Sequence, residues 1–293
     1  YALFLFNLGF WYSENANFLP AESLFKASVK VWEICGIERG AAANTLHVLG
    51  NCLWDEAKYI EAEAAHLRAL AIRRKLFGQV SVEVARSVGN LSGLYTEMGR
   101  YSEALKYYKQ ALEIGKKTHV DTTFGYAITL SNYAVFWQGM GNYVVAESLL
   151  YQSLRIYEQL GQPLGLVYLN LAHTFEMQGN ILKAIEYNNR TIEIWSKSAP
   201  DPLHLPLPMV ALASEYILIG DTSRVESLYV EALKMLEKTY STEHYFVAQT
   251  LESLARFYVR QKRYDEARQL LEKMLSMRQR LLPQDHNELA SGY

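Results

Sequence analysis

The chain has 293 residues, of which half are hydrophobic and 20% are charged, so it can bury a substantial core and intrinsic disorder is excluded. The 29 basic and 31 acidic side chains give a formal net charge of −2, which argues against a nucleic-acid-binding surface of clustered Lys and Arg. Cys35 and Cys52 are the only cysteines, so no disulfide framework is indicated, and no apolar run approaches the ~18 residues of a membrane span.

One alanine recurs along the chain in segments of the form aromatic-x-x-Ala, beginning with Phe18–Ala21 and Tyr59–Ala62. With conservative substitutions included, this marker position is occupied in turn by Ala21, Ala62, Ala104, Ala146, Ala184, Val225 and Ala267. Successive markers are 41 or 42 residues apart, except for the step of 38 from position 146 to position 184. The pattern predicts seven repeats.

Further positions repeat with the marker. Twelve residues before it the side chain is small, at Gly9, Gly50, Ser92, Ala134, Ala172, Ala213 and Ala255. Nine residues before it the side chain is large, at Tyr12, Leu53, Tyr95, Trp137, Phe175, Tyr216 and Tyr258. Five residues before it, four repeats have a glycine, at Gly99, Gly141, Gly179 and Gly220. Small residues let two helices approach closely and glycine suits the turn between them, so each repeat is predicted to be a helix pair, without strands.

Three local features lead to separate expectations. A cluster of prolines before the sixth repeat predicts an extended connection from about Ser198 to Leu207, or else a merely shortened linker. The basic run at 73–75 lies near a predicted helix end, where cations offset the helix dipole. His66 stands at a position held by Phe25 and Tyr108 in other repeats, so it is expected to fill the core.

The order of small residue, aromatic, glycine and alanine resembles the tetratricopeptide repeat, and the period of about 42 residues resembles the kinesin light chain type. Segments such as Leu76–Gly78 leading to Val82–Ala85 resemble the linkers of that type. The resemblance implies an all-α, right-handed superhelical solenoid that forms a single array over 1–293. The expected repeats are roughly 2–42, 43–84, 85–126, 127–164, 165–205, 206–247 and 248–289, with a truncated eighth from 290. A truncated repeat would mean that flanking domains exist in a longer chain.

No catalytic motif is present in the sequence. The seven histidines have no metal-ligand spacing, and there is no P-loop or GxSxG sequence. The chain is therefore predicted to be neither an enzyme nor a cofactor- or metal-binding protein, and the reducing environment suggested by its few cysteines predicts a cytoplasmic location.

A row of asparagines marks a candidate groove. In this type of repeat the first helices are expected to line the concave side, and the position fourteen before the marker is held by Asn7, Val48, Asn90, Asn132, Asn170, Ala211 and Ser253. Asn51 provides an amide in the second repeat. A carboxamide donates and accepts hydrogen bonds, so these side chains could bind the backbone of an extended peptide. Alternatively, they tie neighbouring repeats together.

Positions eleven and seven before the marker set the expected charge. Carboxylates occur in the first three repeats, and two arginines stand one turn apart in the seventh. Between them, Gly93, Val135 and Gly139 are expected to leave room for a partner's side chain. This predicts a ligand that is basic toward repeats one to three and acidic at repeat seven, unless the charges are simply solvated. The candidate peptide-binding residues are Asn7, Asn51, Asp55, Asn90, Glu97, Asn132, Asn170, His173, Arg256 and Arg260.

The sequence thus predicts a protein-interaction scaffold that binds a protein or peptide in its concave groove. The alternative is the sensor or regulatory part of a larger protein whose nucleotide-switch or protease domain lies elsewhere. No nucleic acid or membrane partner is expected.

Overall fold

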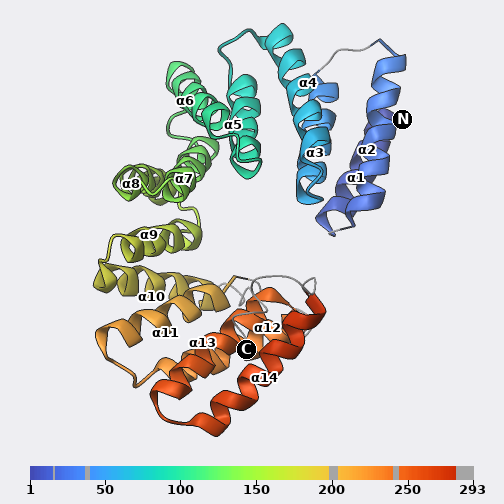
Figure 1. The fold of residues 1–293 in the computed structure, drawn as a ribbon. Coiled ribbons are helices and arrows are strands. Elements are labelled where there is room, and N and C mark those ends of the chain that lie inside the picture. The colour runs from blue at the N-terminus through green and yellow to red at the C-terminus, as the bar shows by residue number, and fades with distance from the viewer. Residues whose placement is uncertain (16, 37–39, 198–203, 240–243, 282–293) are drawn as a thin grey trace. The chain divides into compact units, whose positions relative to one another are not determined.

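A computed structural model describes residues 1–15, 17–36, 40–197, 204–239 and 244–281, and within these ranges it has fourteen α-helices and no strand (Figure 1). The chain forms two compact units, Tyr1–Leu160 and Gly161–Tyr293. The first unit contains α1 (Ala2–Glu14), α2 (Phe18–Ile34), α3 (Gly40–Asp55), α4 (Tyr59–Phe77), α5 (Val82–Glu97), α6 (Tyr101–Lys117), α7 (Phe124–Gly139) and α8 (Tyr143–Gln159). The second contains α9 (Gly165–Met177), α10 (Ile181–Lys197), α11 (Pro206–Ile219), α12 (Val225–Thr239), α13 (Tyr245–Arg260) and α14 (Tyr264–Leu281). The predicted all-α solenoid is confirmed, whereas the repeat boundaries remain predictions and the eighth repeat lies outside the described residues.

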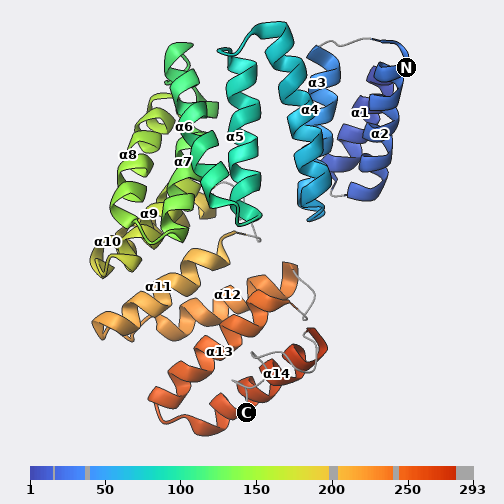
Figure 2. The ribbon, with the colours of Figure 1, turned by 45° about the horizontal axis from the view of Figure 1, so that its top comes forward.

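Within each unit the helices stack in chain order. In the first unit α3 packs on α4, α4 on α5 and α5 on α6, so that antiparallel pairs stand side by side (Figure 2). The first helices of successive pairs also contact each other, α1 with α3 and α5 with α7. Side-chain caps stabilise the N-termini of α5 and α7. Ser81 Oγ accepts from the Val84 amide, and Thr123 Oγ1 accepts from the Tyr126 amide. Consecutive first helices therefore present their side chains along one face of the unit.

The small column lets the two helices of a pair approach closely. A Cβ atom added at Gly50 would lie 2.7 Å from the ring of His66, and one at Gly9 would lie 3.0 Å from the ring of Phe25. His66 has no exposed surface, and the marker alanines Ala62 and Ala104 are likewise fully buried. The small–large packing and the core position of His66 are confirmed.

The turns between paired helices use a left-handed residue. The four predicted glycines, Gly99, Gly141, Gly179 and Gly220, have φ of +70°, +73°, +76° and +80°. Ala57 and Lys262 adopt the same conformation at the corresponding places in the second and seventh repeats, with φ of +57° and +61°. The geometry of the turn is therefore kept where the sequence lacks the residue that suits it best.

Replacing Ala57 with glycine is expected to stabilise the first unit by about 0.5–1 kcal/mol, because the left-handed strain of ~1–2 kcal/mol is relieved against a smaller entropic cost. Urea unfolding followed by circular dichroism measures the change. The matched control is Gly99→Ala, which should destabilise by a similar amount. A loss of stability in Ala57→Gly would contradict this view of the turn.

The last two prolines before the sixth repeat lie in a helix, whereas an extended connection was predicted there. Residues 198–203 lie outside the described ranges, but α11 already begins at Pro206, and Pro208 is also helical. Proline is tolerated there because the first-turn amides have no partner within the helix. The extended connection therefore does not reach Leu207.

Candidate functional site

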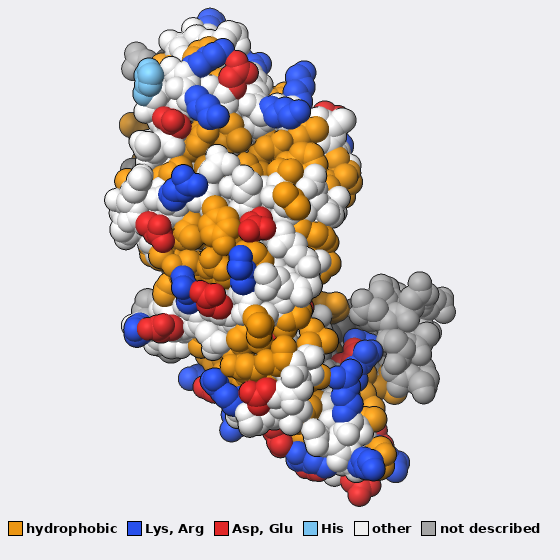
Figure 3. All heavy atoms as spheres, turned by 90° about the vertical axis from the view of Figure 1, so that its left-hand side faces the viewer, with side chains coloured by type: hydrophobic (Ala, Val, Ile, Leu, Met, Phe, Trp, Pro, Cys, Tyr) orange, Lys and Arg blue, Asp and Glu red, His pale blue; other side chains and the backbone are white. Residues whose placement is uncertain are grey.

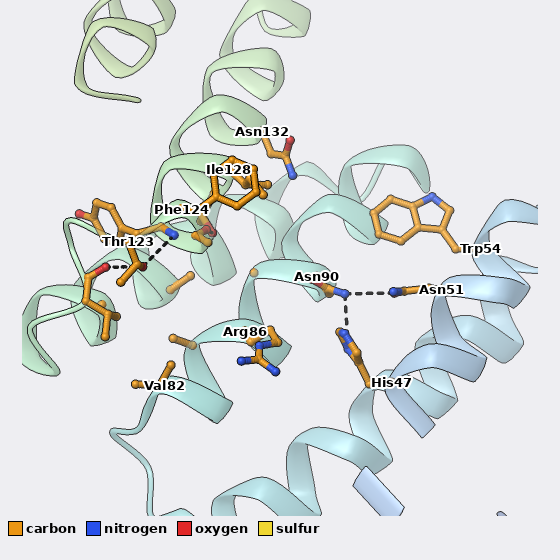
Figure 4. Close-up of a pocket in the computed structure, with 18 of the residues that line it drawn as sticks. His47, Asn51, Trp54, Val82, Arg86, Asn90, Thr123, Phe124, Ile128 and Asn132 are labelled. Carbon is orange, nitrogen blue, oxygen red and sulfur yellow. Dashed lines mark hydrogen bonds between the residues drawn. The ribbon is translucent and has the colours of Figure 1, made fainter. Parts of the chain in front are cut away.

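A cavity of the first unit lies where α3, α5 and α7 face one space (Figure 4). It has a volume of about 850 Å³ and is also bordered by α6 and by the loop before α7. Polar side chains from the three helices line it at His47, Asn51, Asp55, Arg86, Asn90, Thr129 and Asn132. Apolar side chains line it at Trp54, Val82, Phe124 and Ile128. Four candidate residues, Asn51, Asp55, Asn90 and Asn132, are thus brought together.

The asparagines of this cavity do two things. Asn90 Nδ2 donates to Asn51 Oδ1 at 3.1 Å and lies 3.5 Å from His47 Nδ1, so it links the second and third repeats. The pair still has an outward donor in Asn51 Nδ2 and an acceptor in Asn90 Oδ1. Asn132 is exposed and makes no side-chain hydrogen bond to the described residues. Repeat-tying hydrogen bonds therefore occur between Asn51 and Asn90, and amide capacity remains at this cavity for a ligand.

A buried guanidinium lies beneath the polar wall. Arg73 is only 1% exposed, donating from Nη1 to Ser87 Oγ at 2.6 Å and from Nη2 to Asn44 Oδ1 at 2.9 Å. The role expected for this basic run, offsetting the helix dipole, does not describe Arg73 fully, because its side chain turns into the contact between α3, α4 and α5. Burial, with a smaller contribution from the nearby Arg86, lowers the pKa of Arg73 to about 10, which leaves it charged at neutral pH.

Two histidines next to this charge are held neutral. Burial, with help from the Arg73 charge, lowers the pKa of His47 to about 3 and the pKa of His66 to about 4. Their ring centroids are 5.6 Å apart, and both ring nitrogens of His66 are buried without a hydrogen-bond partner. This side of the cavity is therefore positive through Arg73 and Arg86 while its imidazoles are uncharged.

The apolar wall corrects one sequence expectation. A Cβ atom at Gly93 would lie 2.7 Å from the Trp54 ring, so the space at Gly93 is filled by the chain's own indole and is not free for a partner. At Gly139, by contrast, no atom lies within 4 Å of such a Cβ.

The charges around the cavity are mixed. Asp55 lines it, and burial raises the pKa of this carboxyl. Arg86 lines it too, although the sequence prediction placed only carboxylates at this end. Asn7 on α1 and Glu97 on α5 are exposed and lie outside the cavity lining. Arg86 was missed because only two of the groove-facing positions were used to judge charge, although it stands on the same helix face, four residues before Asn90.

The other four candidates lie in the second unit. Asn170 and His173 on α9 line a cavity of about 260 Å³ together with Glu176 and Asn188. Arg256 on α13 is exposed and already donates to Glu252 Oε1 at 2.5 Å, so an acidic ligand would have to compete with Glu252.

Arg260 is exposed one turn further along α13.

Over the described residues, no group of three or more His, Cys, Asp or Glu side chains is placed to hold a metal ion. In the same part of the chain, every helix is too short or too polar to cross a membrane.

One model of the tetratricopeptide repeat matches residues 1–75, 42–117 and 125–197, and a second model with that description matches residues 247–288. The chain belongs to the tetratricopeptide repeat family. No significant match is found among curated protein sequences.

Solved structures of several kinds of protein have a similar fold. A Rap protein complexed with competence and sporulation factor is 17% identical, with a TM-score of 0.68 over 100% of this chain and 76% of that one. The repeats of a putative kinesin light chain from Podosopora anserina are 22% identical, with a TM-score of 0.56 over 69% and 97%. A signal transduction ATPase with numerous domains from Pyrococcus horikoshii, which has a tetratricopeptide repeat sensor, is 19% identical, with a TM-score of 0.70 over 98% and 40%. At these identities the likeness concerns the fold, and it includes the kinesin light chain-like form of the repeat.

Proposed function

We propose that this chain is a non-catalytic protein-interaction module that binds an extended peptide segment in the cavity between α3, α5 and α7. The observation that carries the proposal is the lining of that cavity by carboxamides from three consecutive first helices. Asn51, Asn90 and Asn132 offer donors and acceptors to peptide amides, in a space far larger than a single side chain needs. The similarity to a Rap protein solved in complex with a factor supports a binding role.

The cavity also suits an apolar anchor residue of the peptide. Trp54, Phe124 and Ile128 form a wall beside the amides, and aromatic walls contribute much of the free energy of peptide binding. Arg86 and Asp55 stand at the same cavity with opposite charges, so the ligand proposed for this end need not be uniformly basic.

Replacing Ile128 with glutamate tests the site, because it places a charge on the apolar wall of the cavity. A peptide selected from a phage-displayed random library on the wild-type chain is expected to lose at least about tenfold in affinity, or ~1.4 kcal/mol, by fluorescence polarisation. The matched control is Val144→Glu on α8, an exposed apolar residue outside the cavity lining.

Exposed hydrophobic side chains also occur away from the cavity, interspersed with charges of both signs on the face drawn in Figure 3. Retained affinity in Ile128→Glu together with a loss in Val144→Glu would place the partner on such a surface and contradict the proposal.

A second candidate function is that of a sensor module within a larger protein. It is favoured by the similarity to the tetratricopeptide repeat sensor of the Pyrococcus horikoshii signal transduction ATPase, of which this chain spans 40%. Both functions use the same binding face, and they differ in whether ligand binding changes the activity of an attached effector domain.

A further inference from the structure

The second-unit cavity described above has a buried carboxamide, Asn188, in its lining and a half-buried carboxylate, Glu176, beside it. It measures about 260 Å³ and is lined by Leu169, Asn170, His173, Glu176, Asn188 and Ala211. This volume is below the ~300–1,000 Å³ typical of pockets for whole small molecules, so it suits a single side chain or a group of that size.

Asn188 is the side chain that points to a ligand. It is 1% exposed, its Nδ2 donates to Glu215 Oε1 at 2.8 Å, and its Oδ1 has no hydrogen-bond partner. A buried carbonyl oxygen without a donor is costly, so a donor arriving through the cavity would be well bound.

Glu215 lies directly behind Asn188. It has no exposed surface, and its second oxygen, Oε2, is also without a partner. Burial raises the pKa of Glu215 to about 7, the hydrogen bond from Asn188 opposes this, and the charge of Glu176 adds to the rise. The site is therefore a buried carboxyl that lacks a cation.

The cations of the neighbouring helix are engaged elsewhere. Lys183 lies over the ring of Phe175 at 4.5 Å, and Arg190 pairs with Glu186 at 2.6 Å. His173 lies at the cavity with its Nδ1 3.9 Å from Glu176 Oε2, and it is exposed.

We propose that this cavity binds an alkylammonium group, the head of a lysine side chain of a protein ligand. The ammonium donates to Asn188 Oδ1 and the Glu176 carboxylate, and it supplies the positive charge that Glu215 lacks. Three donors on one small cation match these acceptors, and the four-carbon stem can lie against Leu169 and Ala211, which also line the cavity. This site is separate from the cavity of the first unit and does not rest on the function proposed above.

The probe is the peptide acetyl-Gly-Lys-Gly-amide, with norleucine in place of lysine as the neutral control. Binding is followed on the whole chain by the ¹⁵N side-chain amide resonance of Asn188. We expect a saturable shift with the lysine peptide and none with the norleucine peptide. The affinity should rise about tenfold from pH 6 to pH 8, because the ionised fraction of Glu215 rises through its pKa of about 7.

Glu215→Gln should bind the lysine peptide several-fold more weakly, with the same affinity at pH 6 and pH 8. Glutamine keeps the shape and can donate to Asn188 Oδ1, so the variant should fold, which circular dichroism checks. Glu158→Gln, an exposed carboxylate of the first unit, is the matched control and should behave as wild type. A wild-type pH profile in Glu215→Gln, or an equal shift with norleucine, would overturn the proposal. Binding of butane-1,4-diamine more than about tenfold tighter than the peptide would also overturn it, in favour of a free diamine. The two binding proposals can fail independently, because Ile128→Glu tests the cavity of the first unit and Glu215→Gln tests that of the second.

Discussion

Acidification from pH 7 to pH 5 is expected to lower the free energy of unfolding of the first unit by about 2 kcal/mol through His66 alone. Burial, and then the Arg73 charge, lower its pKa from 6.5 to about 4 in the folded chain. The unfolded chain therefore binds the proton first. The stabilisation from neutral His66 is complete above pH 6.5 and is lost as the pH falls toward 4. His47 acts in the same direction, because its pKa is lowered to about 3.

Urea unfolding at pH 7, 6 and 5, with hydrogen exchange of peptides from α3 and α4, measures this loss. The variant His66→Phe should remove about half of the combined loss from the two histidines, because His47 still acts. Phenylalanine fits there, since Phe25 fills the same position in the first repeat with a glycine facing its ring. His173→Gln, which changes an exposed histidine of the second unit, should leave the loss unchanged. Glu22 has its pKa lowered to about 2 by Lys26, but its contribution is lost only below pH 4.5, outside the measured window. An undiminished loss of stability in His66→Phe would show that His66 is not its source.

The regular columns of the sequence predict the fold because they record contacts that every repeat makes. The marker alanines, the small residues facing aromatic rings and the turn glycines all occupy their predicted places. The exceptions are equally local. Ala57 and Lys262 keep the left-handed turn without glycine, because the packing of the two helices fixes the backbone there whichever residue is present.

The candidate sites were less predictable, because they depend on how individual side chains turn within the stack. The Trp54 ring lies against Gly93, and the Arg73 side chain is buried although it belongs to a basic run near the end of α4. The direction of neither side chain can be predicted from the spacing of residues in the sequence.

The buried polar side chains of the second unit can be recognised in the sequence, because they stand at repeat positions that are mostly apolar in the other repeats. Four residues after the marker, Asn188 interrupts an otherwise apolar or aromatic column together with His66. Ten residues before the marker, Glu215 is the one carboxylate among Trp11, Cys52, Leu94, Phe136, Thr174 and Phe257. A polar residue in a core column therefore points to these sites more directly than the row of asparagines does.

The second unit should show the opposite pH dependence, with its free energy of unfolding falling by about 2 kcal/mol between pH 5 and pH 7. The pKa of Glu215 is raised from 4.5 to about 7, chiefly by burial, so the folded chain binds the proton more tightly than the unfolded chain does. The stabilisation from protonated Glu215 is complete below pH 4.5, is lost as the pH rises through 7, and changes little above pH 8.

Hydrogen exchange separates this effect from that of His66, because peptides from α10 and α11 should lose protection as the pH rises while those from α3 and α4 gain it. Rates are compared after correction for the intrinsic pH dependence of exchange. In Glu215→Gln the loss of protection in α10 and α11 with rising pH should vanish. At pH 8 the variant should also be more stable than wild type, because a neutral amide replaces a buried charge and can donate to Asn188 Oδ1. If Glu215→Gln were less stable than wild type at pH 8, Glu215 would have to be stabilised there as a carboxylate. A cation would then already neutralise it within the folded chain, and the cavity beside Asn188 would have no charge left to offer a ligand.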